Sequence, residues 1–356
     1  RLDVDKQPHE LHLQVGSERG TKYACPVCGA QCPAHDFQEK TWLHLNFFQH
    51  HCYIHASVPR VKCPEHGVKL IEVPWARKGS AFTLLFEQAA LTLVREMPVI
   101  VGARIIEITD KRLWRIVEHY VAKAVAAFDL SSVQAIGLDE TARRRGQNYV
   151  TVFIDMERRD KPVLFVTPGH GKATVKAFAA FLKTHQGHPD RILEVVCDMS
   201  GAFLSAVPKH LPNAQITVDW FHIVKTFSDA LNEVRKAEAR IKPLPKHLHW
   251  AVLKRGEADR LTINQLKALA ELLRQGLDTA TAWRVKERLR WVRLARTPQA
   301  ARWRITRFIN YASELIGESR MLQPVRKALS TLATHAERVV RRWTSTYTNA
   351  RLEGLN

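Results

Sequence analysis

Two short motifs with the spacing of metal ligands constrain this chain more than any other feature. Cys25-Pro-Val-Cys28-Gly and Cys63-Pro-Glu-His66-Gly each carry two ligand side chains separated by two residues. Such a knuckle grips one face of a tetrahedral ion, and two knuckles supply four N/S ligands with no open position for catalysis. The sequence therefore predicts a structural zinc site at Cys25, Cys28, Cys63 and His66. The bound metal would supply folding free energy to a small β-rich module of short segments over residues 1–78.

Other cysteines and histidines leave the ligand set open. Five of the six cysteines lie within the first 63 residues, and clustered cysteines without a secretory signal favour metal binding over disulfides. The competing interpretation is a group of unrelated cysteines and a surface histidine. Alternative ligands are Cys32, Cys52, His51 and His55.

The charge balance indicates a polyanionic partner. The chain has 356 residues, with 54 Lys and Arg against 35 Asp and Glu, a net charge of +19. Such an excess is typical of proteins that meet nucleic acid or an acidic membrane surface. Because no apolar run approaches the roughly 18 residues that span a bilayer, we expect a nucleic-acid partner, no membrane, and a place in the cytosol.

Residues 79–130 have the apolar spacing of helices, and residues 98–116 within them predict a helix, a tight turn and a second helix. Thr109 or Asp110 is placed to cap the second helix, and Ala103 is small enough for the two helices to cross closely. Such a helix-turn-helix leaves basic side chains free to contact DNA. These side chains are Lys111, Arg112 and Arg115.

One residue weakens the match to a helix-turn-helix. Glu107 stands where many such turns carry glycine. The alternative interpretation is a plain helical hairpin with a solvated basic face.

From residue 131 the pattern changes to strands alternating with helices, which predicts an α/β sheet. Asp139 ends the apolar segment 135–138, Asp198 ends the segment 193–197, and Glu353 follows a helical approach from about residue 334. Three convergent carboxylates could hold two Mg²⁺ ions and promote phosphodiester chemistry. Each acid alone has a structural explanation, as a turn cap or a surface residue.

The order of these motifs resembles the transposases of the ISL3 insertion-sequence family. The resemblance rests on the two knuckles, ITDKRLWRIV, GLDET, CDMSGAF, PNAQITVDWFHIVK and NARLEGLN. It implies an RNase H-like core with a catalytic Asp-Asp-Glu triad that binds Mg²⁺ or Mn²⁺, here Asp139, Asp198 and Glu353. Ala350 replaces the glycine that the family usually has in its last motif. Since the family continues beyond this motif, we expect a chain truncated at Asn356.

The spacing of the triad implies an insertion. Asp198 and Glu353 are 155 positions apart, which is too far for a minimal core of this kind. We therefore expect a multidomain α/β protein whose core is interrupted by an all-α insertion. The expected order is a zinc-binding module (1–78), a helix-turn-helix domain (79–130), a first core segment (131–235), the insertion (236–335) and a second core segment (336–356).

The expected insertion carries a basic stretch with interleaved tryptophans. Residues 283–307 contain nine Lys or Arg and a single acid, Glu287. Cations beside aromatic rings suit a distorted DNA end with unpaired bases. The alternative is an amphipathic helix with core tryptophans and solvated arginines. The predicted DNA contacts are Arg284, Lys286, Arg288, Trp291, Arg293, Trp303 and Arg304.

These features together predict a DNA transposase that cleaves the ends of its element and joins them to target DNA. Terminal inverted repeats and target DNA are the expected partners, and two ends imply at least a homodimer. The competing hypotheses are a non-catalytic DNA-binding regulator and an RNase H-like nuclease. Asp219 and His222 either support the catalytic site or form a buried structural pair, and we leave both out of the catalytic set.

Overall fold

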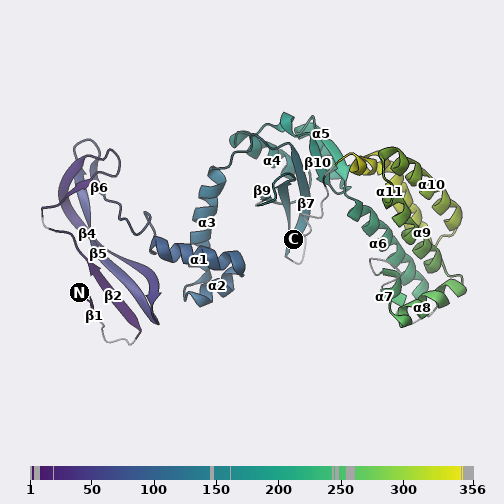
Figure 1. Cartoon of the computed structure of the whole chain (residues 1–356), viewed down its shortest axis with the longest axis horizontal. Coiled ribbons are helices and arrows are strands. Elements are labelled where there is room, and N and C mark those ends of the chain that lie inside the picture. The colour runs from purple at the N-terminus through teal and green to yellow at the C-terminus, as the bar shows by residue number, and fades with distance from the viewer. Residues whose placement is uncertain are drawn as a thin grey trace. The chain divides into compact units, whose positions relative to one another are not determined.

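The computed structural model describes residues 2–3, 9–18, 20–144, 148–160, 162–242, 244, 248–253, 261–345 and 347. The chain divides into two compact units, residues 1–127 and 128–356 (Figure 1). Within the described ranges, no helix combines the length and the apolar character that crossing a membrane requires.

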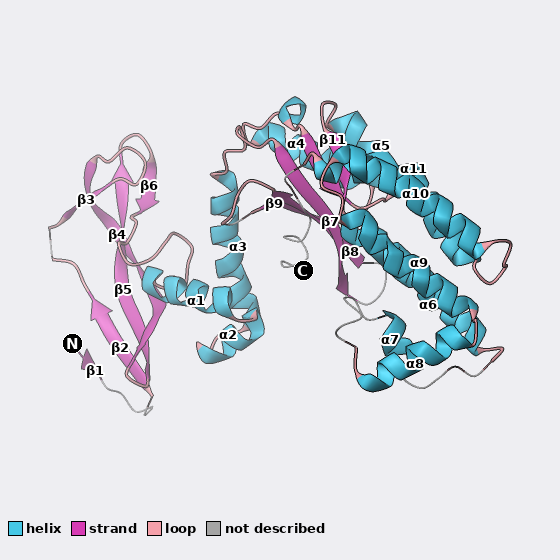
Figure 2. Cartoon of the chain, turned by 45° about the vertical axis from the view of Figure 1, so that its right-hand side comes forward, coloured by secondary structure: helices cyan, strands magenta, loops and turns pink. Residues whose placement is uncertain are grey.

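The first unit begins with a sheet in the order β1-β2-β5-β4-β3, with β6 paired to β5. Two of its strands are much longer than the short segments expected from the prolines and glycines, and Figure 2 shows them side by side as an extended hairpin. Pro33 stands next to a register shift between Ala34 and Asp36, and such bulges accommodate a residue without an N–H group. The strands are β1 (Leu2–Asp3), β2 (Glu10–Val15), β3 (Lys22–Ala24), β4 (Gln31–Phe47), β5 (His50–Cys63) and β6 (Gly67–Leu70).

Three helices complete this unit: α1 (Leu84–Glu96), α2 (Val99–Ile105) and α3 (Asp110–Ala126). The Thr109 hydroxyl accepts a hydrogen bond from the Arg112 backbone N–H and caps α3. Glu107 has φ 56°, the left-handed conformation that usually favours glycine, which explains why this position often carries glycine. Helix, turn and helix therefore occur where the sequence predicted them.

The β4–β5 hairpin and the helices share one apolar core. Leu43 of β4 is buried with Phe86 of α1 and Leu113 of α3. The backbone of Leu43 also bonds to the segment before α1, since its N–H donates to Ala81 and its carbonyl accepts from Thr83. The hairpin and the helices are thus packed together within residues 1–127.

The second unit contains a five-stranded sheet in the order β11-β10-β7-β8-β9. The strands β7, β10 and β11 run parallel, whereas β8 is antiparallel to both of its neighbours. Each strand overlaps a segment that the sequence predicted to be one. The strands are β7 (Ala135–Arg144), β8 (Asn148–Asp155), β9 (Val163–Pro168), β10 (Glu194–Cys197) and β11 (Gln215–Val218).

Two helices, α4 (Lys172–Thr184) and α5 (Gly201–His210), cover one face of this sheet. Their apolar side chains, such as Phe178 and Phe203, are fully buried against Leu138 of β7 and Val195 of β10. Side chains alternate between the two faces of a strand. Residues next to Leu138 and Val195 in sequence therefore project from the opposite face.

After β11 the described residues contain helices and no strand. Figure 2 shows α6, α9, α10 and α11 side by side, and each of them packs against two of the others. Buried side chains such as Phe227, Val285, Phe308 and Leu332 form their common core. The helices are α6 (Trp220–Ala239), α7 (Leu248–Leu253), α8 (Ile263–Arg274), α9 (Asp278–Arg293), α10 (Pro298–Ile316) and α11 (Gln323–Val340).

The end of α11 is anchored to the sheet. Arg341, just after α11, donates a hydrogen bond from its guanidinium to the Ile216 carbonyl of β11, at 3.2 Å. The Trp343 ring meets the Trp220 ring edge-on, with centroids 6.0 Å apart. These contacts return the chain to the sheet before its last residues.

Candidate functional site

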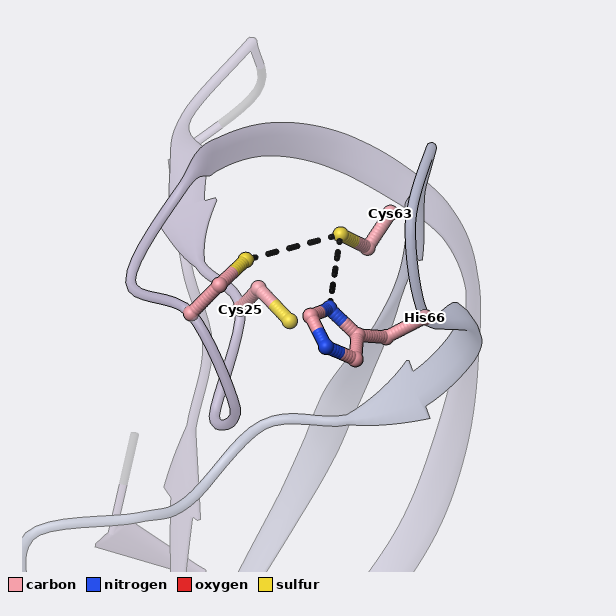
Figure 3. Close-up of side chains that lie close together, drawn as sticks. Cys25, Cys63 and His66 are labelled. Atoms are coloured by element: carbon pink, nitrogen blue, oxygen red, sulfur yellow. Dashed lines mark hydrogen bonds between the residues drawn. The ribbon is translucent and has the colours of Figure 1, made fainter.

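The first site is the cluster formed by the two predicted knuckles. One ligand atom from each of Cys25, Cys28, Cys63 and His66 lies within 4.8 Å of every other. Figure 3 shows Cys63 and His66 on the strand end and turn that face Cys25. Within the ranges that the structure describes, no other group of three or more His, Cys, Asp or Glu side chains has this spacing.

The distances in the cluster match tetrahedral zinc. Cys28 Sγ lies 3.7 Å from Cys63 Sγ, and Cys63 Sγ lies 3.5 Å from His66 Nδ1. Zn–S and Zn–N bonds of about 2.3 and 2.0–2.1 Å at tetrahedral angles require about 3.8 Å and about 3.5–3.6 Å between these atoms. The backbone N–H groups of Cys28 and Val27 lower the pKa of the Cys25 thiol, which favours the thiolate that binds metal. The residues present therefore fit a structural zinc ion.

The alternative ligands lie outside this cluster, although Cys32 packs beside Cys25 and Cys63. His51 Nε2 lies 3.0 Å from Glu107 Oε2, and His55 bonds to His12 and Thr41. Neither Cys32 nor Cys52 belongs to the four-residue cluster. The set predicted from the two knuckles is the one that the fold brings together.

The second site is a row of carboxylates at one edge of the second unit's sheet. Gly137 of β7 is paired with Val196 of β10, and Thr217 of β11 is paired with the same Val196. Two residues after each of these positions stand Asp139, Asp198 and Asp219. Because β7, β10 and β11 are parallel, the register places the three aspartates at the same level of adjacent strands. Side-chain alternation puts all three on the face opposite α4 and α5.

The electrostatics agree with this placement. Burial raises the pKa of Asp139, and the neighbouring charges of Asp198 and Asp219 raise it further, while His222 acts in the opposite direction. A carboxyl group held among other carboxylates is a common feature of functional sites. Asp219 is absent from the predicted catalytic set, and the strand register is the signal that groups it with the other two.

Asp198 and Asp219 also cap local turns, which the structural interpretation expected for Asp198, whereas Asp139 lies within β7. Asp198 Oδ1 accepts from the Ser200 N–H at 2.8 Å, and Asp219 Oδ1 accepts from the Phe221 N–H at 3.3 Å. Asp139 Oδ1 accepts from its neighbour's N–H at 2.8 Å. These hydrogen bonds fix the orientation of each side chain and are compatible with a second role.

Glu353 lies outside the described residues, so the structure does not place it. The nearest described residue is Tyr347, which packs against a cluster that includes Ala135 and Val196. These two residues share the face of Asp139 and Asp198, because they lie an even number of positions before them.

The basic residues predicted to face DNA at α3 differ in exposure. Lys111 and Arg115 are exposed. Arg112 is half-buried, and its guanidinium lies over the Phe82 ring at 4.4 Å. Trp114, which is not among the predicted contacts, is 48% exposed beside them.

The basic stretch of the predicted insertion forms an arginine–tryptophan cluster on α9 and α10. The Trp291 and Trp303 rings are 5.7 Å apart, and the guanidinium groups of Arg288 and Arg304 lie 5.0 and 5.2 Å from the Trp291 ring. Trp303 is 55% exposed. Trp291 is half-buried and packs on the helical core. The cluster therefore combines a core tryptophan with an exposed tryptophan that is available for stacking.

Lys286 does not fit its predicted place in a DNA contact. Its side chain is buried, and its ammonium donates to the Val252 carbonyl at 3.2 Å and to Glu287 at 2.8 Å. The helical period turns this position toward the core, which a count of basic residues along the sequence does not reveal. Arg284 and Arg293, on the same helix, are exposed.

Comparison with known families gives three matches in chain order. Residues 22–66 match the zinc-finger of transposases IS204/IS1001/IS1096/IS1165. Residues 71–121 match the helix-turn-helix domain of transposase family ISL3, and residues 136–356 match the ISL3 transposase domain of the DDE type.

Individual relatives agree with these matches. The chain is 26% identical over 288 residues to the transposase for insertion sequence element IS1001 of Bordetella parapertussis, covering 78% of this chain and 70% of the relative. It is 27% identical over 215 residues to the transposase for IS1557 of Mycobacterium tuberculosis, covering 60% of this chain. That match spans about half, 48%, of the length of the mycobacterial relative.

A zinc ribbon, a helix-turn-helix and a DDE transposase domain in this order define a DNA transposase. The chain belongs to the ISL3 family of insertion-sequence transposases, as its motif order suggested. A zinc-binding module, a helix-turn-helix and a mixed α/β region are thereby confirmed.

Proposed function

We propose that the second unit is an RNase H-like catalytic core interrupted by an all-α insertion. The observation in favour is the strand order, in which an antiparallel β7–β8–β9 meander is extended by parallel β10 and β11. The insertion would cover residues 236–335, from the end of α6 to a point within α11, and the chain would resume the core at residue 336. Contacts of Arg341 and Trp343 with the sheet region support this return.

Asp139, Asp198 and Glu353 form the catalytic triad in this proposal and would hold Mg²⁺ or Mn²⁺. Carboxylate oxygens are the ligands that these hard cations prefer. Bound ions supply charge stabilisation to the attacking and leaving oxygens of a phosphodiester. Asp139, Asp198 and Glu353 together would hold these ions. The observation that carries this assignment is the matched level of Asp139 and Asp198 on neighbouring parallel strands.

In such a site, the backbone around the aspartates would hold their carboxylates in a fixed orientation. The hydrogen bonds from the Glu140 and Ser200 N–H groups orient the carboxylates of Asp139 and Asp198 before substrate arrives. Strands and hydrogen bonds thus preorganise two of the three acids, which favours precise positioning of a reacting group. Asp139 and Asp198 are half-buried and Asp219 is buried, so their charges interact more strongly than they would in bulk water.

The proposed reaction is strand cleavage at the element ends followed by transfer of the freed 3′-hydroxyl to target DNA. The zinc module and the helix-turn-helix would recognise the terminal inverted repeats. Lys111 and Arg115 of the helix-turn-helix would contact the DNA, and so would Arg112 from its position over the Phe82 ring. Two ends require two active sites, so we propose a homodimer.

The α9–α10 surface is the proposed second DNA contact. Exposed arginines there would neutralise backbone phosphates, and the exposed Trp303 ring would stack on an unpaired base. Lys286 is left out because it is buried. The residues retained are Arg284, Arg288, Trp291, Arg293, Trp303 and Arg304.

A strand-cleavage and joining assay tests the proposal. Duplexes carrying the element's own ends are incubated with the full chain and Mg²⁺, and Asp139→Asn and Asp198→Asn variants are compared with Asp160→Asn. Asp160 is exposed in the loop between β8 and β9 of the same unit, so it is a matched control. We expect cleavage and joining by the wild type and Asp160→Asn alone.

Three other results would contradict the proposal. Joining by Asp139→Asn at the wild-type rate would remove that residue from the chemistry. Cleavage without joining would favour the nuclease hypothesis. Binding of the ends without cleavage or joining would favour the regulator.

A further inference from the structure

The tip of the β4–β5 hairpin exposes two adjacent aromatic rings. Phe47, paired with His50, closes the hairpin, and Phe48 stands in the turn. Phe47 is 57% exposed and Phe48 is 85% exposed, and their rings meet edge-on with centroids 4.8 Å apart. Phe48 has φ 52°, a left-handed conformation that a bulky side chain rarely adopts. The positive φ belongs to the two-residue turn that closes the hairpin, whereas the exposed apolar surface opposes folding and is not explained by the fold.

The helix-turn-helix holds this hairpin in place. Leu45 of β4 and Tyr53 of β5 pack on the core that contains Leu113 of α3. His44 Nδ1 lies 2.8 Å from the hydroxyl of Thr83, the residue that caps α1. The strands on both sides of the tip are therefore attached to the helices.

A further contact places the tip beside the turn that leads into α3. His51 Nε2 lies 3.0 Å from Glu107 Oε2, and Glu107 is three residues before the start of α3. Phe48 is three residues from His51, so the two lie at most about 10 Å apart along the chain. The tip thus projects near the end of α3 at which a helix-turn-helix enters the major groove of DNA.

The residue types at the tip indicate the kind of surface that it contacts. Its four residues are Asn46, Phe47, Phe48 and Gln49, all exposed and none of them acidic. Proteins that bind the minor groove contact base edges with residues such as asparagine and glutamine, and insert apolar wedges that partly unstack a base step. The area argues against a second copy of the chain as the occupant. Two phenylalanines supply roughly 300–500 Å², whereas a stable protein interface needs about 800 Å² from each partner.

We propose that the hairpin tip is a DNA wedge that inserts Phe47 and Phe48 into the minor groove next to the major groove contacted by α3. This proposal rests on the DNA-binding role within the proposed function and adds a groove and a mode of contact to it. Because a wedge is apolar, it contributes unstacking and bending without releasing counterions.

The test uses the full zinc-loaded chain and a duplex carrying one end of its element, with 2-aminopurine substituted at successive base steps. Bound wild-type protein should raise the 2-aminopurine fluorescence at one step. The F47A/F48A variant should lose this signal and bind on the order of tenfold more weakly, with an unchanged dependence on salt concentration. Both side chains are exposed, so the variant keeps its core.

Phe37→Ala is the matched control, because Phe37 is also on β4 and is 53% exposed away from the tip. It should bind and unstack DNA as the wild type does. Wild-type affinity and fluorescence in F47A/F48A would overturn the wedge while leaving the proposed function intact. Loss of self-association in that variant, with unchanged DNA binding, would overturn it in favour of a contact between copies. Failure of the wild type to bind any element end would overturn the DNA-binding function and the wedge together.

Discussion

Asp139 and Asp198 stand at matching positions of two adjacent parallel strands, because Gly137 and Val196, two residues before them, are paired in the β7–β10 ladder. Residues 59 positions apart in the chain are thereby brought to the same level of one sheet edge. Asp219 extends the row on β11, since Thr217 is paired with the same Val196. The active-site proposal follows from this register.

The crowded carboxylates predict that one substitution stabilises the protein while abolishing its chemistry. The pKa of Asp139 is raised in the folded state, so the stability associated with its protonated form is present at low pH and is lost as pH rises through the folded pKa. At neutral pH, Asp139→Asn removes a partly buried charge and its repulsion from Asp198 and Asp219. We expect its metal-free thermal midpoint to lie on the order of 2–4 °C above that of the wild type. A lower midpoint, measured by scanning calorimetry in EDTA after zinc loading is verified, would contradict the arrangement.

The knuckle geometry predicts one zinc ion per chain. Cys63→Ser removes a thiolate ligand, so bound zinc measured by elemental analysis should fall from about one equivalent to nearly none. Cys32→Ser is the matched control, because Cys32 is buried nearby but lies outside the four-residue cluster. It should keep its zinc. Equal loss in both variants would show that the ligand set is wrong.

A buried carboxylate in the first unit predicts a pH-dependent stability. Glu87 is fully buried and accepts hydrogen bonds from Tyr120, Arg77 and Ser80. Burial and the bond to Glu87 raise the pKa of Tyr120 to about 12. The stabilisation from the protonated tyrosine is therefore fully present below the ordinary tyrosine value near pH 10 and is lost as pH rises through 12.

Tyr120→Phe removes that effect. Urea titrations at pH 9 should show a loss of about 1.5–3 kcal/mol, because one charge-assisted hydrogen bond to a buried carboxylate is missing. The difference between the variant and the wild type should shrink toward pH 12. A stability difference that stays constant with pH would show that the effect of Tyr120 does not come from its hydrogen bond to Glu87.

The α9 helix offers two basic residues with opposite predicted behaviour. Arg288 is exposed, so Arg288→Ala should lower the slope of log affinity against log salt by about one if it contacts a phosphate. Lys286 is buried and already bonded, so Lys286→Met should leave that slope unchanged and reduce stability by roughly 1–3 kcal/mol. Salt titrations of DNA binding and urea unfolding together separate the two. Equal slopes for Arg288→Ala and the wild type would remove α9 from the proposed interface.

Much of the architecture could be predicted from local patterns. Ligand spacing identified Cys25, Cys28, Cys63 and His66, because two knuckles leave few other ways to close a tetrahedral site. The Thr109 cap and the apolar spacing after it located α3. The alternation of apolar strands with helices predicted the mixed sheet.

The remaining features depend on tertiary contacts that sequence patterns do not encode. Asp219 joins Asp139 and Asp198 only through the strand register, which a single strand does not reveal. Lys286 is buried because α9 turns this position toward the helical core, where its ammonium bonds to the Val252 carbonyl of α7, although its neighbours in sequence suggest a solvated basic face. Residues 1–78 were expected to form short segments because prolines and glycines interrupt their sequence, whereas pairing on both sides of β5 sustains long strands.

The central claim is that Asp139, Asp198 and Glu353 share bound divalent cations, and calorimetric titration of the zinc-loaded chain with Mn²⁺ tests it most directly. Asp139→Asn, Asp198→Asn and Glu353→Gln should each weaken binding at this site by about tenfold or more, while Asp160→Asn binds Mn²⁺ as the wild type does. Wild-type binding by any one of the three variants would contradict the shared site.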